Sequence, residues 1–220
     1  MSAQNKTAAT SYLPYDATLL AIAGFMVVVF LTLTTSGLHP VVFADEWEYS
    51  SWSRLIPLAK SPVPSYLYLL LYKNTRSCGA GFLECARILN ACFFALSLPF
   101  IYLTARRFTS SKTALFIAII TVFGPISSYA TYFMPEAMYF FSFWVFAWFV
   151  LSQLDGGPIR LGTGAGILLG VSALIKAHAV FLLAGFMLFV ALTLIYRFER
   201  ASIVDGLRTV ASAALGFLAV

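Results

Sequence analysis

Long apolar stretches separated by short polar segments dominate the pattern of this chain. A helix needs about 20 apolar residues to cross the hydrocarbon core of a bilayer, and several of the stretches approach that length. The pattern predicts helical spans at Ala17–Gly37, Arg87–Thr104, Ala114–Tyr132, Ala137–Leu154, Leu161–Ile175, Ala177–Tyr196 and from Ile203 to Val220. We therefore expect an all-α fold, a polytopic transmembrane helical bundle of about seven spans. Because the last span is still apolar at Val220, we expect residues 17–220 to be the N-terminal membrane module of a longer protein.

The composition supports a membrane protein. Of the 220 residues, 60% are hydrophobic and 10% are charged, whereas soluble domains are about half apolar and about a quarter charged. The 14 Lys and Arg residues exceed the 9 Asp and Glu residues and give a net charge of +5. The basic residues flank the apolar stretches instead of forming one basic face, so we exclude a nucleic-acid partner.

The distribution of basic residues predicts which ends of the spans face the cytoplasm. The short segment from Arg106 to Lys112 contains three basic residues and no acid, which is typical of a cytoplasmic loop. We therefore expect residues 1–16 to form a cytoplasmic N-terminal tail and residues 38–86 to form a long first loop on the outer face. The expected location is a plasma membrane, the bacterial inner membrane in particular.

The first outer loop has a helical periodicity of its own. One apolar stripe of a helix is formed by Trp52, Leu55, Ile56 and Ala59. This stripe predicts an amphipathic surface helix from Glu46 to Ala59, which ends at the two prolines of segment 60–64. A second short apolar helix, at the surface or re-entrant, is predicted at Ser65–Tyr72.

An acidic cluster follows the first span. Asp45, Glu46 and Glu48 place three carboxylates within four residues of a chain that is poor in charge. A carboxylate just outside a span can act as a general base toward a substrate hydroxyl, and burial would raise its pKa toward a useful range. The spacing from Asp45 to Glu48 also matches a capping box, in which Asp45 caps the surface helix. The spacing alone leaves both roles open.

Several short motifs follow one another in a recognisable order. They are segments 45–49 (DEWEY), 61–68 (SPVPSYLY), 87–90 (RILN), 105–108 (ARRF), 135–137 (PEA) and 169–176 (LGVSALIK). This order resembles that of polytopic membrane glycosyltransferases of the GT-C class, which take sugars from polyprenyl-phosphate donors. Protein O-mannosyltransferases and lipid A aminoarabinose transferases are similar examples. The resemblance covers about residues 17–196, although the proline-rich turn lacks the His often found there and the next outer loop lacks a clear second Asp.

The resemblance implies roles for particular side chains. Asp45, with Glu46 beside it, would be catalytic and would remove the proton of the acceptor hydroxyl as the anomeric carbon is inverted. The substrate and its phosphate would be bound by Tyr66, Arg87, Glu136, Lys176 and His178. A divalent metal ion is a possible cofactor, with Asp45 and Glu136 as candidate ligands.

Each of the binding residues also has a structural interpretation. Lys176 can extend along apolar surface to reach the membrane interface, and Arg87 can pair with an acid of the outer loop. Glu136 at the start of a span is favoured by the helix dipole. A single His such as His178 is more often a packed polar residue than a ligand.

The resemblance implies an inverting glycosyltransferase. It would move a sugar from a polyprenyl-phosphate-linked donor to a glycan, lipid or protein acceptor on the outer face. The alternatives are a non-catalytic GT-C-like subunit of a larger membrane complex and a transporter of a lipid-linked sugar. Transport usually requires ionisable residues near the bilayer midplane, whereas almost all of those in this chain lie at the ends of spans.

Cysteines and glycines add two further expectations. Cys78 and Cys85 lie in the first outer loop and would pair in an oxidising compartment. If both lay on one helix, about 10 Å would separate their Cα atoms and forbid the bond. The fifth span contains the small-residue positions Gly162, Gly164, Gly166 and Gly170, which predict close packing against another helix.

Overall fold

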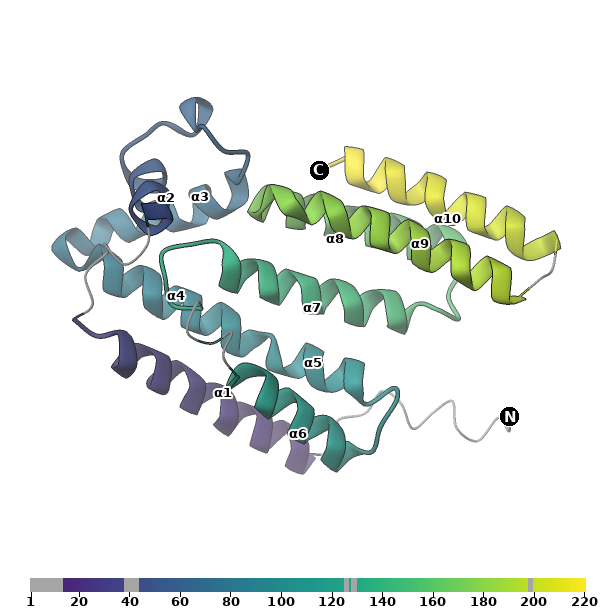
Figure 1. The fold of residues 1–220 in the computed structure, drawn as a ribbon, viewed down its shortest axis with the longest axis horizontal. Helices are drawn as coiled ribbons and strands as arrows, with labels where there is room; N and C mark the ends of the chain where they lie inside the picture. Colours follow the sequence, from purple (N-terminus) through teal and green to yellow (C-terminus); the bar gives the residue numbers. More distant parts are fainter. Residues whose placement is uncertain (1–13, 38–43, 125–126, 128–129, 198–199) are drawn as a thin grey trace.

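A computed structural model describes the fold of residues 14–37, 44–124, 127, 130–197 and 200–220 (Figure 1). Within these residues the chain is helical and contains no strand. The elements are α1 (Pro14–Thr35), α2 (Ala44–Arg54), η2 (Leu58–Lys60), α3 (Tyr66–Tyr72), η3 (Lys73–Gly81), α4 (Phe82–Leu96), α5 (Leu98–Ala105), α6 (Ser111–Val122), α7 (Glu136–Ser152), α8 (Pro158–Ile175), η5 (Ala177–Ala179), α9 (Val180–Arg197) and α10 (Arg200–Leu218). The prediction of an all-α fold is therefore confirmed for the part of the chain that is described.

Three helical segments are long and apolar enough to cross a membrane. Among the described residues they are Tyr15–Thr35, Tyr66–Ala105 and Pro158–Ile175. Shorter apolar helices occupy Ser111–Val122, Glu136–Ser152 and Ala177–Thr193. Together they make the chain an integral membrane protein, whereas the expected number of seven spans stays a prediction.

Two predicted spans differ from the observed helices. The predicted span Arg87–Thr104 begins earlier, at Phe82, and is divided between α4 and α5 at Ser97, where Pro99 follows without a backbone N–H. The predicted span Ala114–Tyr132 is shorter, because α6 ends at Val122 and a Gly-Pro pair follows at 124–125. The predicted sixth span begins with η5 before α9, and the other spans agree with α1, α7, α8 and α10 to within a few residues at each end.

The surface helix of the first loop is shorter than the apolar stripe predicts. Helix α2 begins at Ala44 and ends at Arg54, so the predicted end at Ala59 is wrong. Pro57 explains the difference, because a proline disfavours the helical conformation of the residue before it. Leu55 is consequently 69% exposed instead of lying on a buried helical face. The second short helix is confirmed as α3.

The ends of α1 and α8 and the starts of α4 and α7 lie near α2 and α3, and three long-range contacts join them there (Figure 1). Arg87 at the start of α4 contacts the last residue of α1, and Lys176 after α8 contacts the first residue of α7. Glu46 of α2 contacts the segment before α7. We call this the α2 end of the bundle. At the opposite end, Asp16 of α1 accepts hydrogen bonds from Tyr102 of α5 and Ser111 of α6.

Helices α8 and α10 pack against each other at very short range. A Cβ atom added at Gly162 would lie 2.2 Å from the carbonyl oxygen of Thr209, and one at Gly166 would lie 2.1 Å from that of Ala213. Only glycine allows the two backbones to approach so closely. The predicted packing role of these glycines is confirmed, and Gly164 likewise leaves room for the ring of Phe149 in α7.

Candidate functional site

The two acids that begin α2 have opposite environments. Asp45 is exposed, whereas Glu46 has 0% of its surface exposed. Both lie in the first turn of a helix that begins at Ala44, so Asp45 lies inside the helix and not at the position before it that a capping residue takes. The arrangement leaves the Asp45 carboxylate available to a substrate and fixes its neighbour in the protein.

Glu46 joins four parts of the chain at the α2 end. Its Oε1 accepts the backbone N–H of Phe133 at 3.0 Å and lies 3.7 Å from Nη2 of Arg87. Arg87 is 2% exposed, and its Nη1 donates to the carbonyl oxygen of Thr35 at 2.9 Å. Arg87 therefore pairs with an acid of the first loop, as its structural interpretation predicted. Because α1, α2, α4 and segment 130–135 meet here, the pair holds α2 and Asp45 in place.

Burial and the partners of Glu46 act in opposite directions on the pKa of its carboxyl group. Removal from water raises the pKa of its carboxyl group, and the hydrogen bond from Phe133 and the charge of Arg87 act in the opposite direction. Burial is the larger influence, so the pKa lies above its ordinary value. The second oxygen, Oε2, is buried and accepts no hydrogen bond from the described residues, which is the oxygen that a proton would occupy.

Asn90 holds the segment that precedes α7. Its side-chain amide donates to the carbonyl oxygen of Tyr132 and its side-chain oxygen accepts the hydroxyl of Tyr72. Asn90 has 0% of its surface exposed. Arg87 and Asn90 are three residues apart in α4 and therefore lie on one helix face, from which Asn90 contacts Tyr132 and Arg87 contacts Glu46, the acceptor of the Phe133 N–H.

An aromatic cluster connects α2 with α3 and this same segment. The rings of Tyr68 and Tyr72 stack with centroids 4.1 Å apart, Tyr49 meets Tyr68 edge-on at 5.6 Å, and Phe133 meets Tyr72 at 5.4 Å. Burial raises the pKa of Tyr49, a hydrogen bond from Ser65 opposes this, and the charges of Glu136, Asp45 and Glu48 raise it further. The negative charges of Asp45 in α2 and Glu136 at the start of α7 therefore act in the same direction on one tyrosine.

Lys176 and Glu136 form an ion pair at this end of the bundle. Nζ lies 2.6 Å from Oε1, and the two side chains are 24% and 30% exposed. Helix α8 ends at Ile175 and the backbone of Lys176 is extended, which turns the lysine toward the first residue of α7. The structure thus brings together two of the predicted binding residues, a cation and an acid, from different helices.

An apolar cavity opens beside Glu136. Its volume is about 380 Å³, and it is lined by Phe94, Ala130, Glu136, Ala137, Tyr139, Phe140, Phe143 and Trp144. Glu136 is the only charged side chain of this lining. The cavity therefore suits the apolar part of an amphiphilic ligand whose polar part lies at Glu136 and Lys176.

Two predicted binding residues are at the surface. Tyr66 begins α3 and is 43% exposed. His178 lies in η5, is exposed, and has its ring 6.4 Å from that of Phe181. Their predicted roles in binding stay predictions.

The donor set does not favour a metal ion. Within the part of the chain that the structure describes, no group of three or more His, Cys, Asp and Glu side chains is placed to hold one. Of the two predicted ligands, Glu136 already has one carboxylate oxygen on an ammonium group. We derive no chemical step through a metal ion.

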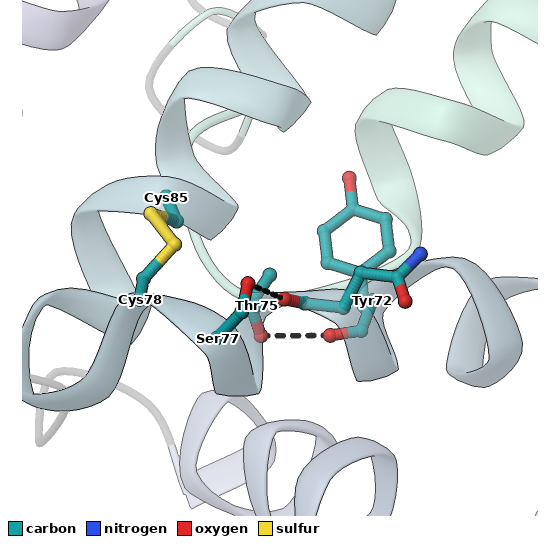
Figure 2. Close-up of a disulfide and its surroundings, with 6 residues drawn as sticks. Tyr72, Thr75, Ser77, Cys78 and Cys85 are labelled. Atoms are coloured by element: carbon teal, nitrogen blue, oxygen red, sulfur yellow. Dashed lines mark hydrogen bonds between the residues drawn. A yellow bond between two sulfur atoms is a disulfide. The ribbon is translucent and has the colours of Figure 1, made fainter.

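Cys78 and Cys85 form a disulfide between η3 and the first turn of α4 (Figure 2). The helix does not continue between them, because Gly79 has a φ of +58°, a conformation that glycine adopts easily. The Cα atoms are consequently 6.7 Å apart. Nearby, the hydroxyl of Thr75 donates to the carbonyl oxygen of Tyr72 at 2.7 Å (Figure 2). The disulfide therefore braces the start of the helix that carries Arg87 and Asn90.

A family comparison identifies the chain. Residues 59–219 match the model of the family described as dolichyl-phosphate-mannose-protein mannosyltransferase. The chain belongs to this family. It is therefore a membrane glycosyltransferase of the GT-C kind, and the resemblance inferred from the motifs is confirmed. The match begins after α2 and so is independent of Asp45 and Glu46. Comparisons with curated proteins and with solved structures give no significant match.

Sequence reasoning did not assign a role to several residues of the site. Asn90 belongs to the Arg-x-x-Asn motif, and its three-residue spacing from Arg87 was a signal that both act on one face of the helix. Tyr68 and Tyr72 are four residues apart and share a face in the same way. Their partner Phe133 is distant in sequence, so no local pattern indicates that contact.

Proposed function

We propose that this protein transfers a sugar from a polyprenyl-phosphate-linked donor to an acceptor hydroxyl on the outer face of the membrane. The observation that carries the proposal, together with membership of the family, is the arrangement of Asp45. Its carboxylate is exposed on a helix whose neighbouring residue is buried in an ion pair. A general base must be accessible to substrate and held at a fixed position, and α2 meets both conditions.

In this proposal four charged residues at the α2 end have separate tasks. Asp45 accepts the proton of the acceptor hydroxyl as that oxygen attacks the anomeric carbon with inversion. Lys176 binds the phosphate, whose negative charge grows as the leaving group departs. Glu46 and Arg87 position α2, because both are buried and in contact with each other.

The proposal also includes the membrane topology. The chain crosses the membrane seven times with its N-terminus inside, so that the α2 end faces the outer compartment. The disulfide at this end supports that orientation, because disulfides persist in oxidising compartments and are rare in the cytoplasm.

Replacement of Asp45 by Asn tests the base. Asn has nearly the same size and shape as Asp, and Asp45 is exposed, so the substitution should leave the fold intact and remove only the basic oxygen. We expect sugar transfer by the full-length protein, reconstituted with a polyprenyl-phosphate-linked donor, to fall by about 10²–10⁴-fold. The matched control is Glu48→Gln, which removes an exposed acid from the same helix and should leave transfer within about twofold, as expected for a group outside the chemistry.

Other outcomes separate the alternatives. If Asp45→Asn transfers sugar at the rate of the wild type, Asp45 is not the general base. If the wild-type protein folds normally but transfers no sugar from any donor tested, the non-catalytic subunit of a membrane complex becomes the better interpretation.

A further inference from the structure

The ion pair between Lys176 and Glu136 is incomplete on the side of the acid. Oε1 of Glu136 lies 2.6 Å from Nζ of Lys176. Oε2 is buried and accepts no hydrogen bond from the described residues. One carboxylate oxygen therefore contacts the lysine, and the other has no hydrogen-bond partner among the described residues, at the edge of an apolar cavity.

The surroundings keep electrostatic interactions at this place strong. Seven of the eight side chains that line the 380 Å³ cavity are apolar or aromatic, and Glu136 is the eighth. Charges that are partly removed from water interact more strongly than exposed ones, because the effective dielectric constant is lower. An anion that approaches Lys176 must therefore compete with Glu136 and is repelled by it.

We propose that Glu136 is a resident counter-ion that shifts the preference of this site toward a lipid phosphodiester and away from a lipid phosphomonoester. The inference rests on the proposed function, in which Lys176 binds the phosphate of the donor. It adds a role for Glu136, which discriminates between the donor and the product that remains after the sugar has left.

The charge balance of the transfer gives this discrimination its consequence. A new bond forms between the acceptor oxygen and the anomeric carbon, and the bond between that carbon and the phosphate oxygen breaks. The electron pair of the broken bond stays on the phosphate, and the proton of the acceptor moves to Asp45. A phosphodiester with one negative charge thereby becomes a monoester with a charge of about −1.5 to −2 at neutral pH.

The added charge acts directly on Glu136. The single positive charge of Lys176 lies between the Glu136 carboxylate and the phosphate of the ligand. Only the phosphate gains negative charge in the reaction. At a separation of a few ångströms in a partly screened environment, repulsion between Glu136 and one additional unit of negative charge lowers the affinity for the monoester by about tenfold relative to a site without the acid. The carboxylate therefore favours release of the spent lipid and retention of the donor.

Binding of two short probes tests the inference. Farnesyl phosphate is a monoester and methyl farnesyl phosphate is a diester with the same chain, and both can be titrated calorimetrically into the full-length protein in lipid nanodiscs. The wild-type protein should bind the monoester, relative to the diester, less tightly than a variant without the acid does. In Glu136→Gln, the affinity for the monoester relative to that for the diester should rise by about tenfold, since the repulsive charge is absent. An unchanged ratio, or weaker binding of the monoester by the Gln variant, would overturn the inference.

Three further variants and one further probe define the site. Glu136→Asp keeps the charge and should keep the wild-type ratio of the two affinities. Glu84→Gln removes another exposed acid, from the first turn of α4, and should behave as wild type. Lys176→Met should weaken the binding of both farnesyl probes by at least tenfold. Inorganic phosphate should bind at least a hundredfold more weakly than farnesyl phosphate, because the cavity holds the chain, and equal binding would contradict the assignment to a lipid.

The two proposals fail in different ways. If Lys176→Met binds both probes as the wild type does while the wild type transfers sugar, the counter-ion role and the assignment of the phosphate to Lys176 are wrong, and the proposed sugar transfer stands. If the wild type transfers no sugar but Glu136→Gln changes the ratio of affinities as expected, the proposed function is wrong and the binding role of Glu136 stands.

Discussion

Glu46 illustrates how a single buried carboxylate can fix the position of the helix that carries a neighbouring exposed acid. It has 0% exposure, and its recorded partners are the backbone N–H of Phe133 and the guanidinium of Arg87. Burying an ion pair offers little net stability compared with apolar packing, but removing one partner leaves an uncompensated buried charge and is costly. The pair therefore specifies the position of α2 more than it stabilises the fold, and the neighbouring Asp45 gains from that fixed position.

The raised pKa of Glu46 predicts a pH dependence of stability. A carboxyl group whose pKa is higher in the folded state binds more protons when folded, so stability falls as the pH rises from the ordinary pKa through the folded pKa. A tenfold difference in proton affinity corresponds to about 1.4 kcal/mol. In Glu46→Gln this titration is absent. The difference between the melting temperature of the variant and that of the wild type should therefore change in favour of the variant as the pH rises from about 4 to about 7.

Thermal unfolding in detergent across this pH range measures the difference. Arg87→Met provides a second test, because the guanidinium charge lowers the pKa of Glu46 and its loss should extend the sensitive range to higher pH. A melting-temperature difference between Glu46→Gln and wild type that stays constant from low to neutral pH would contradict the prediction.

At the scale of elements, the sequence predicted the spans better than the site. Apolar length and small-residue spacing are local patterns, so α1, α7, α8 and the glycine face of α8 were predictable. Local turn chemistry explains the misplaced ends of α2 and α6, since Pro57 and the pair at 124–125 end helices that their apolar pattern would continue. The pairing of Glu46 with Phe133 could not be predicted, because it depends on contacts between residues distant in the chain. The separation of Asp45 from Glu46 by burial depends on the same contacts.

The close approach of α8 and α10 predicts opposite effects for two glycine substitutions. An alanine at 166 would place Cβ 2.1 Å from the carbonyl oxygen of Ala213, so the helices must separate, and Gly166→Ala should destabilise the protein by about 1–3 kcal/mol. Gly185 in α9 has no atom within 4 Å of an added Cβ, and Gly185→Ala should stabilise the helix by up to about 1 kcal/mol. Unfolding titrations with denaturing detergent compare the two variants. Equal effects would show that α8 and α10 are not in close contact.

At the scale of the whole molecule, all contacts that build the site lie at one end of the bundle. Glu46 with Phe133, Arg87 with Thr35, and Lys176 with Glu136 join helices that run in alternating directions. The disulfide lies at this same end, whereas the contacts of Asp16 with Tyr102 and Ser111 lie at the other. The two ends therefore differ in chemistry, and an active site at the α2 end requires this end to be in the compartment where the acceptor is found.

Labelling with a membrane-impermeant maleimide tests this topology in intact cells. The labelled positions are Asn74, which is exposed at the α2 end, and Lys112, which is exposed at the start of α6 at the opposite end. In a background with Cys92→Ala, Asn74→Cys should react in intact cells under the proposed topology, in which the α2 end faces outward. Lys112→Cys should react only after permeabilisation, since a short basic segment such as 106–112 is typical of a cytoplasmic loop. In the Cys92→Ala background alone, Cys78 and Cys85 should react only after reduction, because they are joined in a disulfide. Labelling of Lys112→Cys in intact cells would reverse the orientation and would place Asp45 in the cytoplasm, where an outer-face acceptor could not reach it.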